Sequence, residues 1–180
     1  MNTVYFINQS YLNRFSWLNG STDEDYIKPA IRLAQLKRVR FYLGKCLYDK
    51  LESLVQNQDA GDATSINDAS NAKYKTLLDT YVMDVTMYWT LVELYPYLVS
   101  KIDNANIQKR VAQNTETLTR DELADMVGNE KSNAQHFTDQ MIKYLCDLEG
   151  DNVISEWETC DNTLSNTNRS DLTHMPIDVV

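Results

Sequence analysis

The sequence predicts an all-α protein, a small helical bundle of three to four main helices with a short extended or hairpin excursion and an extended C-terminal tail. Three observations indicate this fold. Apolar residues recur at helical spacing over three long stretches, two of these stretches begin with capping residues, and polar segments separate them. We expect an N-terminal arm over residues 1–20, a helical domain over 21–158 and a tail over 159–180.

The first helix is predicted over residues 26–55. Ser21, Asp23 and Asp25 offer side-chain oxygens to the first amides of a helix. Ser21 and Glu24 also have the spacing of a capping box, and Pro29 is tolerated only near the start of a helix. The apolar stripe of this helix comprises Ile27, Ala30, Ile31, Ala34, Leu43, Leu47, Leu51 and Leu54. Because Gly44 interrupts the stripe, we expect one long helix that is kinked at this glycine.

The second helix begins at Tyr74, after a polar loop over residues 57–71, and shows the strongest periodicity in the chain. Its stripe comprises Tyr74, Leu77, Leu78, Tyr81, Val82, Val85, Tyr88, Trp89, Val92 and Tyr95. Pro96 removes a backbone donor and clashes with the carbonyl four residues earlier, so the helix should end or bend there.

Residues 101–118 lose helical periodicity, which favours a short hairpin or an extended excursion. Thr119 and Glu122 then form a second capping box, which starts the third helix. The buried stripe of that helix is predicted to comprise Leu123, Val127, Ala134, Phe137, Met141, Tyr144 and Leu148, interrupted once by Glu130. Gly150 should end the helix in the left-handed conformation.

The two ends of the chain differ from the predicted bundle. The stretch from Asp161 to Val180 is polar and lacks a period, so it should be extended or disordered in isolation. Its last residues, MPIDVV, are more apolar, which suggests a short adhesive end, although a frayed terminus explains them equally well. The aromatic residues of the N-terminal arm form either an interface or part of the core, and they are Tyr5, Phe6, Tyr11, Phe15 and Trp17.

Charge is unevenly distributed along the chain. The net charge is −9, with +3 in residues 1–56 and −12 in residues 57–180. A basic first helix on an acidic body can pair head-to-tail with a second copy, although a solvated helix explains the same charges. A nucleic-acid patch is disfavoured because the basic side chains do not share one helix face.

The sequence offers no recognisable catalytic or metal-binding pattern. His136 and His174 have no Cys or carboxylate at ligand spacing, and no phosphate-binding glycine motif occurs. Three cysteines, odd in number and far apart, argue against a disulfide framework. The first residues lack the features of a secretory signal, and no run of apolar residues is long enough to cross a membrane, so we expect the protein to fold in a reducing cytosol. We expect no enzyme activity and no cofactor.

Several segments together resemble the head-to-tail connector (adaptor) proteins of tailed phages, most closely a Bacteroidetes-phage version that includes crAss-like phages. The resemblance covers roughly residues 20–157. Its motifs are DEDYIKPAIRLAQ, LGKCLYDKL, KYKTLLDTYVMDVTMYWTLVELYP, NIQKRVAQNTETLTRDEL and NAQHFTDQMIKYLCDLEGD.

The resemblance implies a virion structural protein. Proteins of that family are helical bundles that form a ring, commonly of twelve copies, in the neck between portal and tail. This chain would be made in the host bacterial cytoplasm, dock under the portal protein and contact the next tail or neck protein. DNA would pass through the channel without sequence-specific binding, and no membrane would be involved.

Two groups of residues are candidates for these contacts. The charged residues proposed to join neighbouring copies are Arg32, Lys37, Arg38, Arg40, Asp125 and Glu130. The tail residues proposed to dock on the portal are Leu172, Met175, Pro176, Ile177, Val179 and Val180. The alternatives are a tail-completion or neck protein of an adjacent ring, and a cytosolic regulator that binds a partner helix along an aromatic-rich groove.

Overall fold

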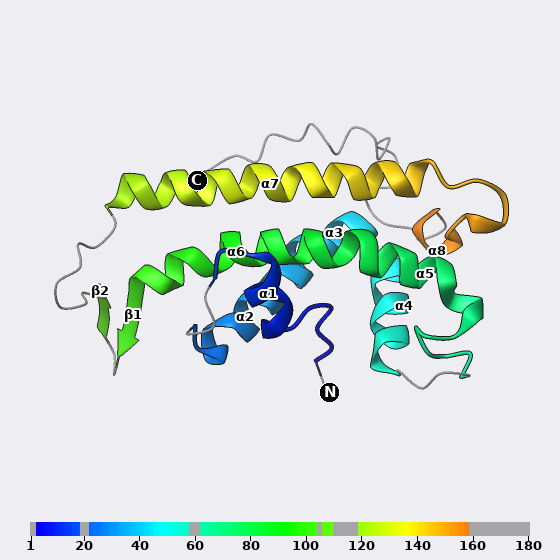
Figure 1. Ribbon diagram of the computed structural model, residues 1–180, viewed down its shortest axis with the longest axis horizontal. Helices are drawn as coiled ribbons and strands as arrows, with labels where there is room; N and C mark the ends of the chain where they lie inside the picture. Colours follow the sequence, from blue (N-terminus) through cyan, green and yellow to red (C-terminus); the bar gives the residue numbers. More distant parts are fainter. Residues whose placement is uncertain (1–2, 19–21, 58–61, 104–105, 110–118, 159–180) are drawn as a thin grey trace.

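The computed structural model describes residues 3–18, 22–57, 62–103, 106–109 and 119–158, and it confirms the predicted all-α bundle (Figure 1). The α-helices are α1 Gln9–Phe15, α2 Glu24–Ala34, α3 Arg40–Leu43, α4 Lys45–Gln56, α5 Ala72–Leu77, α6 Met83–Val99, α7 Arg120–Cys146 and α8 Ser155–Glu158. Two π-helical segments, η1 Gln35–Val39 and η3 Leu78–Val82, and two 3₁₀ segments, η2 Ala69–Asn71 and η4 Gly150–Asn152, join them.

The predicted excursion after the second helix contains a hairpin. Strand β1 Ser100–Asp103 pairs antiparallel with β2 Asn106–Lys109, with Ile102 opposite Ile107. The remainder of the predicted excursion, residues 110–118, lies outside the described residues. The strands extend from one end of the bundle (Figure 1).

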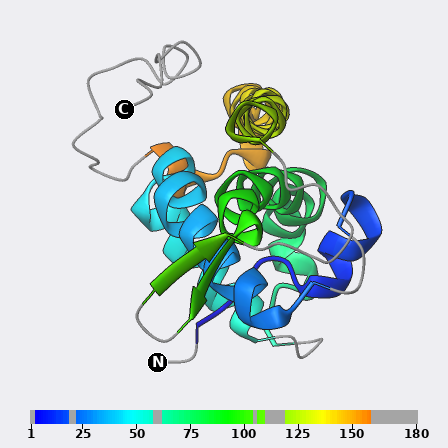
Figure 2. The same ribbon diagram turned by 90° about the vertical axis from the view of Figure 1, so that its left-hand side faces the viewer.

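Helix α6 lies at the centre of the bundle. Helix α7 runs antiparallel along one side of it, and α2 packs on another side (Figures 1 and 2). The buried residues of α6 are Val85, Thr86, Met87, Trp89, Thr90, Leu91, Leu94 and Tyr95. Burial therefore extends well beyond the predicted stripe, and the two threonines are accommodated because each hydroxyl donates to the carbonyl four residues earlier, at 2.6 Å. Pro96 does not end α6, which continues to Val99.

The first predicted helix is divided into consecutive segments. Asp23 caps the first of them as predicted, because its side chain accepts a hydrogen bond from the Asp25 amide, and Ser21 lies outside the described residues. The predicted kink at Gly44 is a complete break between α3 and α4, where the backbone has φ +76° and ψ 160°. A non-glycine residue would be strained in this conformation, so glycine is required at this corner.

The N-terminal arm is part of the core and includes a helix, α1, that the periodicity did not predict. Gln35 on η1 holds the start of the arm. Its side-chain oxygen accepts from the Phe6 amide at 3.1 Å, and its side-chain nitrogen donates to the Val4 carbonyl and the Tyr48 hydroxyl, both at 3.2 Å. Phe6 and Leu12 are buried as a result.

Helix α7 begins as predicted, with both hydrogen bonds of the Thr119–Glu122 capping box present. Its buried residues are Glu130, Ala134, Thr138, Met141, Ile142 and Leu145. The other residues predicted for this stripe are only partly buried, and they are Leu123, Val127, Phe137, Tyr144 and Leu148. Gly150 has the predicted positive φ of +61°, but it follows the helix by several residues and begins η4.

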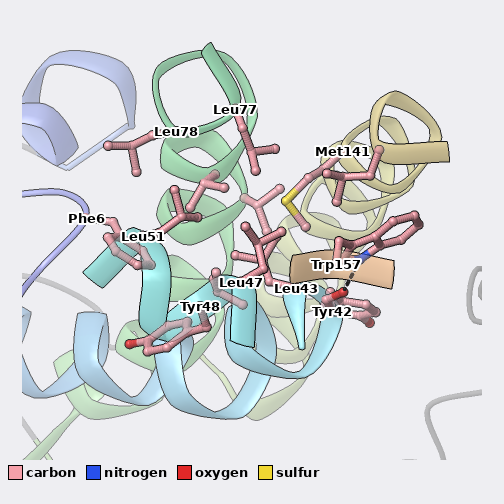
Figure 3. Close-up of a cluster of buried hydrophobic side chains, with 14 of the residues drawn as sticks. Phe6, Tyr42, Leu43, Leu47, Tyr48, Leu51, Leu77, Leu78, Met141 and Trp157 are labelled. Atoms are coloured by element: carbon pink, nitrogen blue, oxygen red, sulfur yellow. Dashed lines mark hydrogen bonds between the residues drawn. The ribbon is translucent and has the colours of Figure 1, made fainter. Parts of the chain in front are cut away.

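The main core cluster joins segments that are far apart in the sequence (Figure 3). Leu43, Leu47 and Leu51 face Leu77 from α5 and Met141 from α7. Trp157 on α8 closes this cluster, and its indole N–H donates to the carbonyl of Tyr42 at 3.4 Å. The folded body thus extends from the N-terminal arm to α8.

Replacement of Trp89 by alanine should destabilise the fold strongly. Trp89 is fully buried on α6, and its indole N–H donates to the Thr138 hydroxyl on α7 at 3.1 Å. We expect Trp89→Ala to lower the free energy of unfolding by about 3–5 kcal/mol, measured by urea denaturation. Tyr97→Ala, at an exposed position of the same helix, serves as the control and should change it by less than about 0.5 kcal/mol.

Candidate assembly surface

The cations predicted to join neighbouring copies lie on α2, η1 and α3, and two of them are paired within the chain. The Lys37 ammonium lies 3.0 Å from a carboxylate oxygen of Glu93 on α6. The Arg40 guanidinium lies 3.9 Å from Asp49 on α4 and 5.7 Å from the centre of the Tyr48 ring. These pairs are partly exposed, so an interprotomer role for either cation stays a prediction.

Arg38 has a different environment. Its guanidinium carbon lies 4.5 Å from the centre of the Trp89 ring, a cation–π distance. Its Nε is buried and has no hydrogen-bond partner, and no ion pair involves Arg38 among the described residues. Burial raises the pKa of the nearby Tyr42 hydroxyl, and the positive charge of Arg38 opposes that rise. Within the described ranges, Arg38 is therefore a cation without a carboxylate partner.

Arg32 is accessible to solvent. Its side chain is exposed on α2, and its guanidinium donates to the Thr3 hydroxyl at 3.2 Å. It lines a cavity of about 350 Å³ between the N-terminal arm, α2, η1 and α4. A larger cavity of about 590 Å³ lies between the arm, α2 and the α5–η3 region, and it includes Glu24, Lys28 and Asp79 among polar and apolar neighbours.

The two predicted acidic partners lie on α7 in opposite environments. Asp125 is exposed, as an interprotomer role requires. Glu130 is only 7% exposed, and its carboxylate accepts hydrogen bonds from the Tyr95 hydroxyl and from the Asn133 amide at 3.3 Å. The assignment of Glu130 to an interprotomer contact was wrong, because a side chain satisfied inside the fold cannot reach a neighbouring copy.

Large apolar side chains are exposed at positions that the charge pattern did not indicate, with Tyr97 on α6 and Met126 on α7 among them. Phe15 and Trp17 lie at the end of α1, and Leu36 and Phe41 lie on η1 and α3. Figure 2 shows α1 and α3 on opposite sides of α6. The aromatic residues of the arm therefore do not share one environment, since Phe6 lies in the core and Trp17 lies on the surface. The portal-docking candidates of the tail lie outside the described residues.

Metal sites, membrane-spanning helices and cysteines are the other features that the sequence analysis addressed. Within it, no cluster of His, Cys, Asp and Glu could hold a metal ion, and no helix is long and apolar enough to cross a membrane. Cys46 is disulfide-bonded, which corrects the expectation from cysteine spacing. Separation along the sequence does not limit which cysteines folding brings together.

The comparison with protein families identifies this chain. A model described as a family of unknown function (DUF6712) matches residues 41–167. The chain belongs to this family. The match begins on α3 and includes the whole of α6 and α7, the central pair of the fold. Searches of curated proteins and of solved structures each found no match.

The Tyr95–Glu130 contact should make the fold sensitive to alkaline pH. Burial, the charge of Glu130 and the hydrogen bond to it raise the pKa of Tyr95 from 10.0 to about 12. Between these values the folded state keeps a proton that the unfolded state loses, so the free energy of unfolding should fall as pH rises. We expect Tyr95→Phe to reduce this fall by up to about 2 kcal/mol, measured by urea denaturation across that pH range.

Tyr97→Phe is the matched control, because it removes a hydroxyl from an exposed side chain close by on the same helix. It should leave the pH dependence unchanged. Tyr11 and Tyr74 also have a raised pKa, through burial and hydrogen bonds to Asp84 and Glu156, so part of the fall should remain in Tyr95→Phe. An identical pH dependence in Tyr95→Phe and the original chain would contradict the assignment.

Proposed function

We propose that the chain is a virion structural protein that forms a ring in the neck, between the portal and the tail of a phage. Each copy would contact two neighbours, extend the DNA channel and present a surface to the next tail or neck protein. Its C-terminal tail would dock on the portal. The protein would have no enzymatic role, and its copies would be made in the cytoplasm of the host bacterium.

The observation that carries the proposal is that some of the exposed large apolar side chains lie on elements at opposite sides of the bundle. Phe15 and Trp17 lie on one side, and Leu36 and Phe41 lie on elements of the other. Exposed apolar groups of this size are typical of protein contacts when they gather. A subunit of a closed ring needs two different contact surfaces that face opposite neighbours, and exposed apolar groups on opposite sides would suit that need.

The charges of the folded body support passage of DNA rather than binding to it. Lys28, Lys37 and Lys45 each have a carboxylate within 4 Å, at Glu24, Glu93 and Asp49 respectively. Pairing within the chain reduces the positive potential that phosphates would meet. The net charge of −9 also disfavours retention of DNA in a channel.

The regulator alternative depended on an open groove lined by aromatic residues. Tyr74, Trp89 and Tyr95 are instead buried in the chain's own core. A partner helix would therefore have to use another surface. A place in an adjacent ring of the neck remains a second candidate, because the same two-sided exposure suits any ring subunit.

Electron microscopy of the purified chain, alone and mixed with the portal protein encoded in the same genome, tests the proposal. Rings of the chain, or an added layer of density on the portal, would support the connector role. A layer on another neck protein, with no affinity for the portal, would move the chain to an adjacent ring. A monomer that joins neither would overturn the proposal.

Removal of the tail should separate docking from folding. We expect a chain that ends after Cys160 to keep the thermal unfolding midpoint of the full chain, since all three cysteines, α8 and the core before it are retained. Portal binding, measured by co-sedimentation, should fall at least about tenfold, because the apolar end that would anchor the contact is gone. Undiminished portal binding by the shortened chain would refute the role of the tail.

Arg38 is the predicted cation that can be tested most cleanly. Arg38→Met keeps an unbranched side chain over Trp89 but removes the charge, so the monomer should stay folded. We expect ring assembly to weaken severalfold and to lose part of its salt sensitivity, as measured by sedimentation in low and high salt. Lys45→Met, which removes a mostly exposed cation of α4, is the control. Assembly of Arg38→Met equal to that of the control would exclude an interprotomer role for Arg38.

A further inference from the structure

Trp17 is the most exposed large apolar side chain in the described part of the protein, at 91% of its surface. It follows the end of α1, beyond the cap residue Ser16, whose amide and hydroxyl both bind the Leu12 carbonyl. Arg14 lies three residues earlier and has an exposed side chain. Its guanidinium lies 5.2 Å from the centre of the Phe15 ring and has no carboxylate partner among the described residues.

The cavity of about 350 Å³ offers complementary chemistry. Leu36 and Val4 supply apolar surface, while Arg32 and Glu52 supply opposite charges at its wall. Glu52 has no ion pair within the described residues. The cavity volume lies within the range of about 300–1,000 Å³ that is typical of small-ligand pockets, so an indole ring can enter.

We propose that Trp17 of one copy inserts into this cavity of a second copy, with Arg14 of the first copy paired to Glu52 of the second. The indole ring would pack on Leu36 and against the Arg32 guanidinium, a favourable cation–π arrangement. A tryptophan in a desolvated pocket, flanked by a charge pair, has the features of an interface hot spot. This inference rests on the proposed ring and identifies the surfaces that would join its subunits.

The arrangement in space favours a contact between copies. Helix α1, which precedes Trp17, lies on the opposite side of α6 from α3 and α4 (Figure 2). The cavity is lined in part by α4, through Tyr48, Asp49 and Glu52. Trp17 would therefore project from one side of a copy, while the cavity includes residues of the opposite side. A contact between Trp17 of one copy and the cavity of the next is head-to-tail, so it repeats from copy to copy and can close a ring.

Charge reversal tests the contact. Arg14→Glu and Glu52→Arg each place like charges in the contact, and Trp17→Ala removes the inserted ring. We expect each variant to associate at least about tenfold more weakly than the original chain, in sedimentation velocity of the full chain alone and with the portal. An equimolar mixture of Arg14→Glu and Glu52→Arg should recover association, because every contact between alternating copies then joins opposite charges.

Tyr97→Ala controls for the loss of an exposed aromatic residue and should associate normally. Thermal unfolding followed by circular dichroism should be unchanged in all variants, since Arg14 and Trp17 are exposed and Glu52 is half-buried. If the original chain assembles and the three variants assemble equally well, this inference is overturned and the proposed ring stands. If the original chain associates neither with itself nor on the portal, both are overturned.

Discussion

Burial of α6 on almost every side is the constraint on which the rest of the structure depends. One helix can be covered in this way only if several others pack around it, and α2 and α7 provide most of that cover. Trp89 shows how closely the elements are joined, because its ring contacts the Arg38 guanidinium and its N–H binds Thr138 on α7. The family match to residues 41–167 includes this central pair.

The N-terminal half of the bundle is held by polar groups as well as by apolar packing. Gln35 satisfies backbone groups of the arm from a buried position in a π-helical segment, and the Tyr11 hydroxyl donates to Asp84 on α6 at 2.8 Å. Buried polar groups are costly unless they are bonded, so such contacts fix the path of the arm in a way that apolar packing alone would not. They also determine where α1 presents Phe15 and Trp17.

The surface has two chemical characters that bear on assembly. Many of its cations are paired with carboxylates of the same chain. Its exposed aromatic and aliphatic side chains, in contrast, are not packed into the core. Exposed ion pairs contribute little to stability, and large apolar groups lose more unfavourable hydration when a partner covers them. For the proposed ring, apolar insertion with local charge pairing would therefore give a more specific contact than the broad attraction between a basic helix and an acidic body.

The sequence by itself determined the fold class, the Thr119 capping box, Gly44 as the point where the first helix changes direction, and the loss of helix after the second helix, because these depend on short-range periodicity and on single residues with special backbone preferences. Only the tertiary structure decided that α1 exists, that Glu130 is buried against Tyr95, and that Trp17 is exposed while Phe6 is not. Each of these outcomes depends on residues far away in the chain. Local pattern cannot specify them, because burial is a property of which elements meet and not of the residue that is buried.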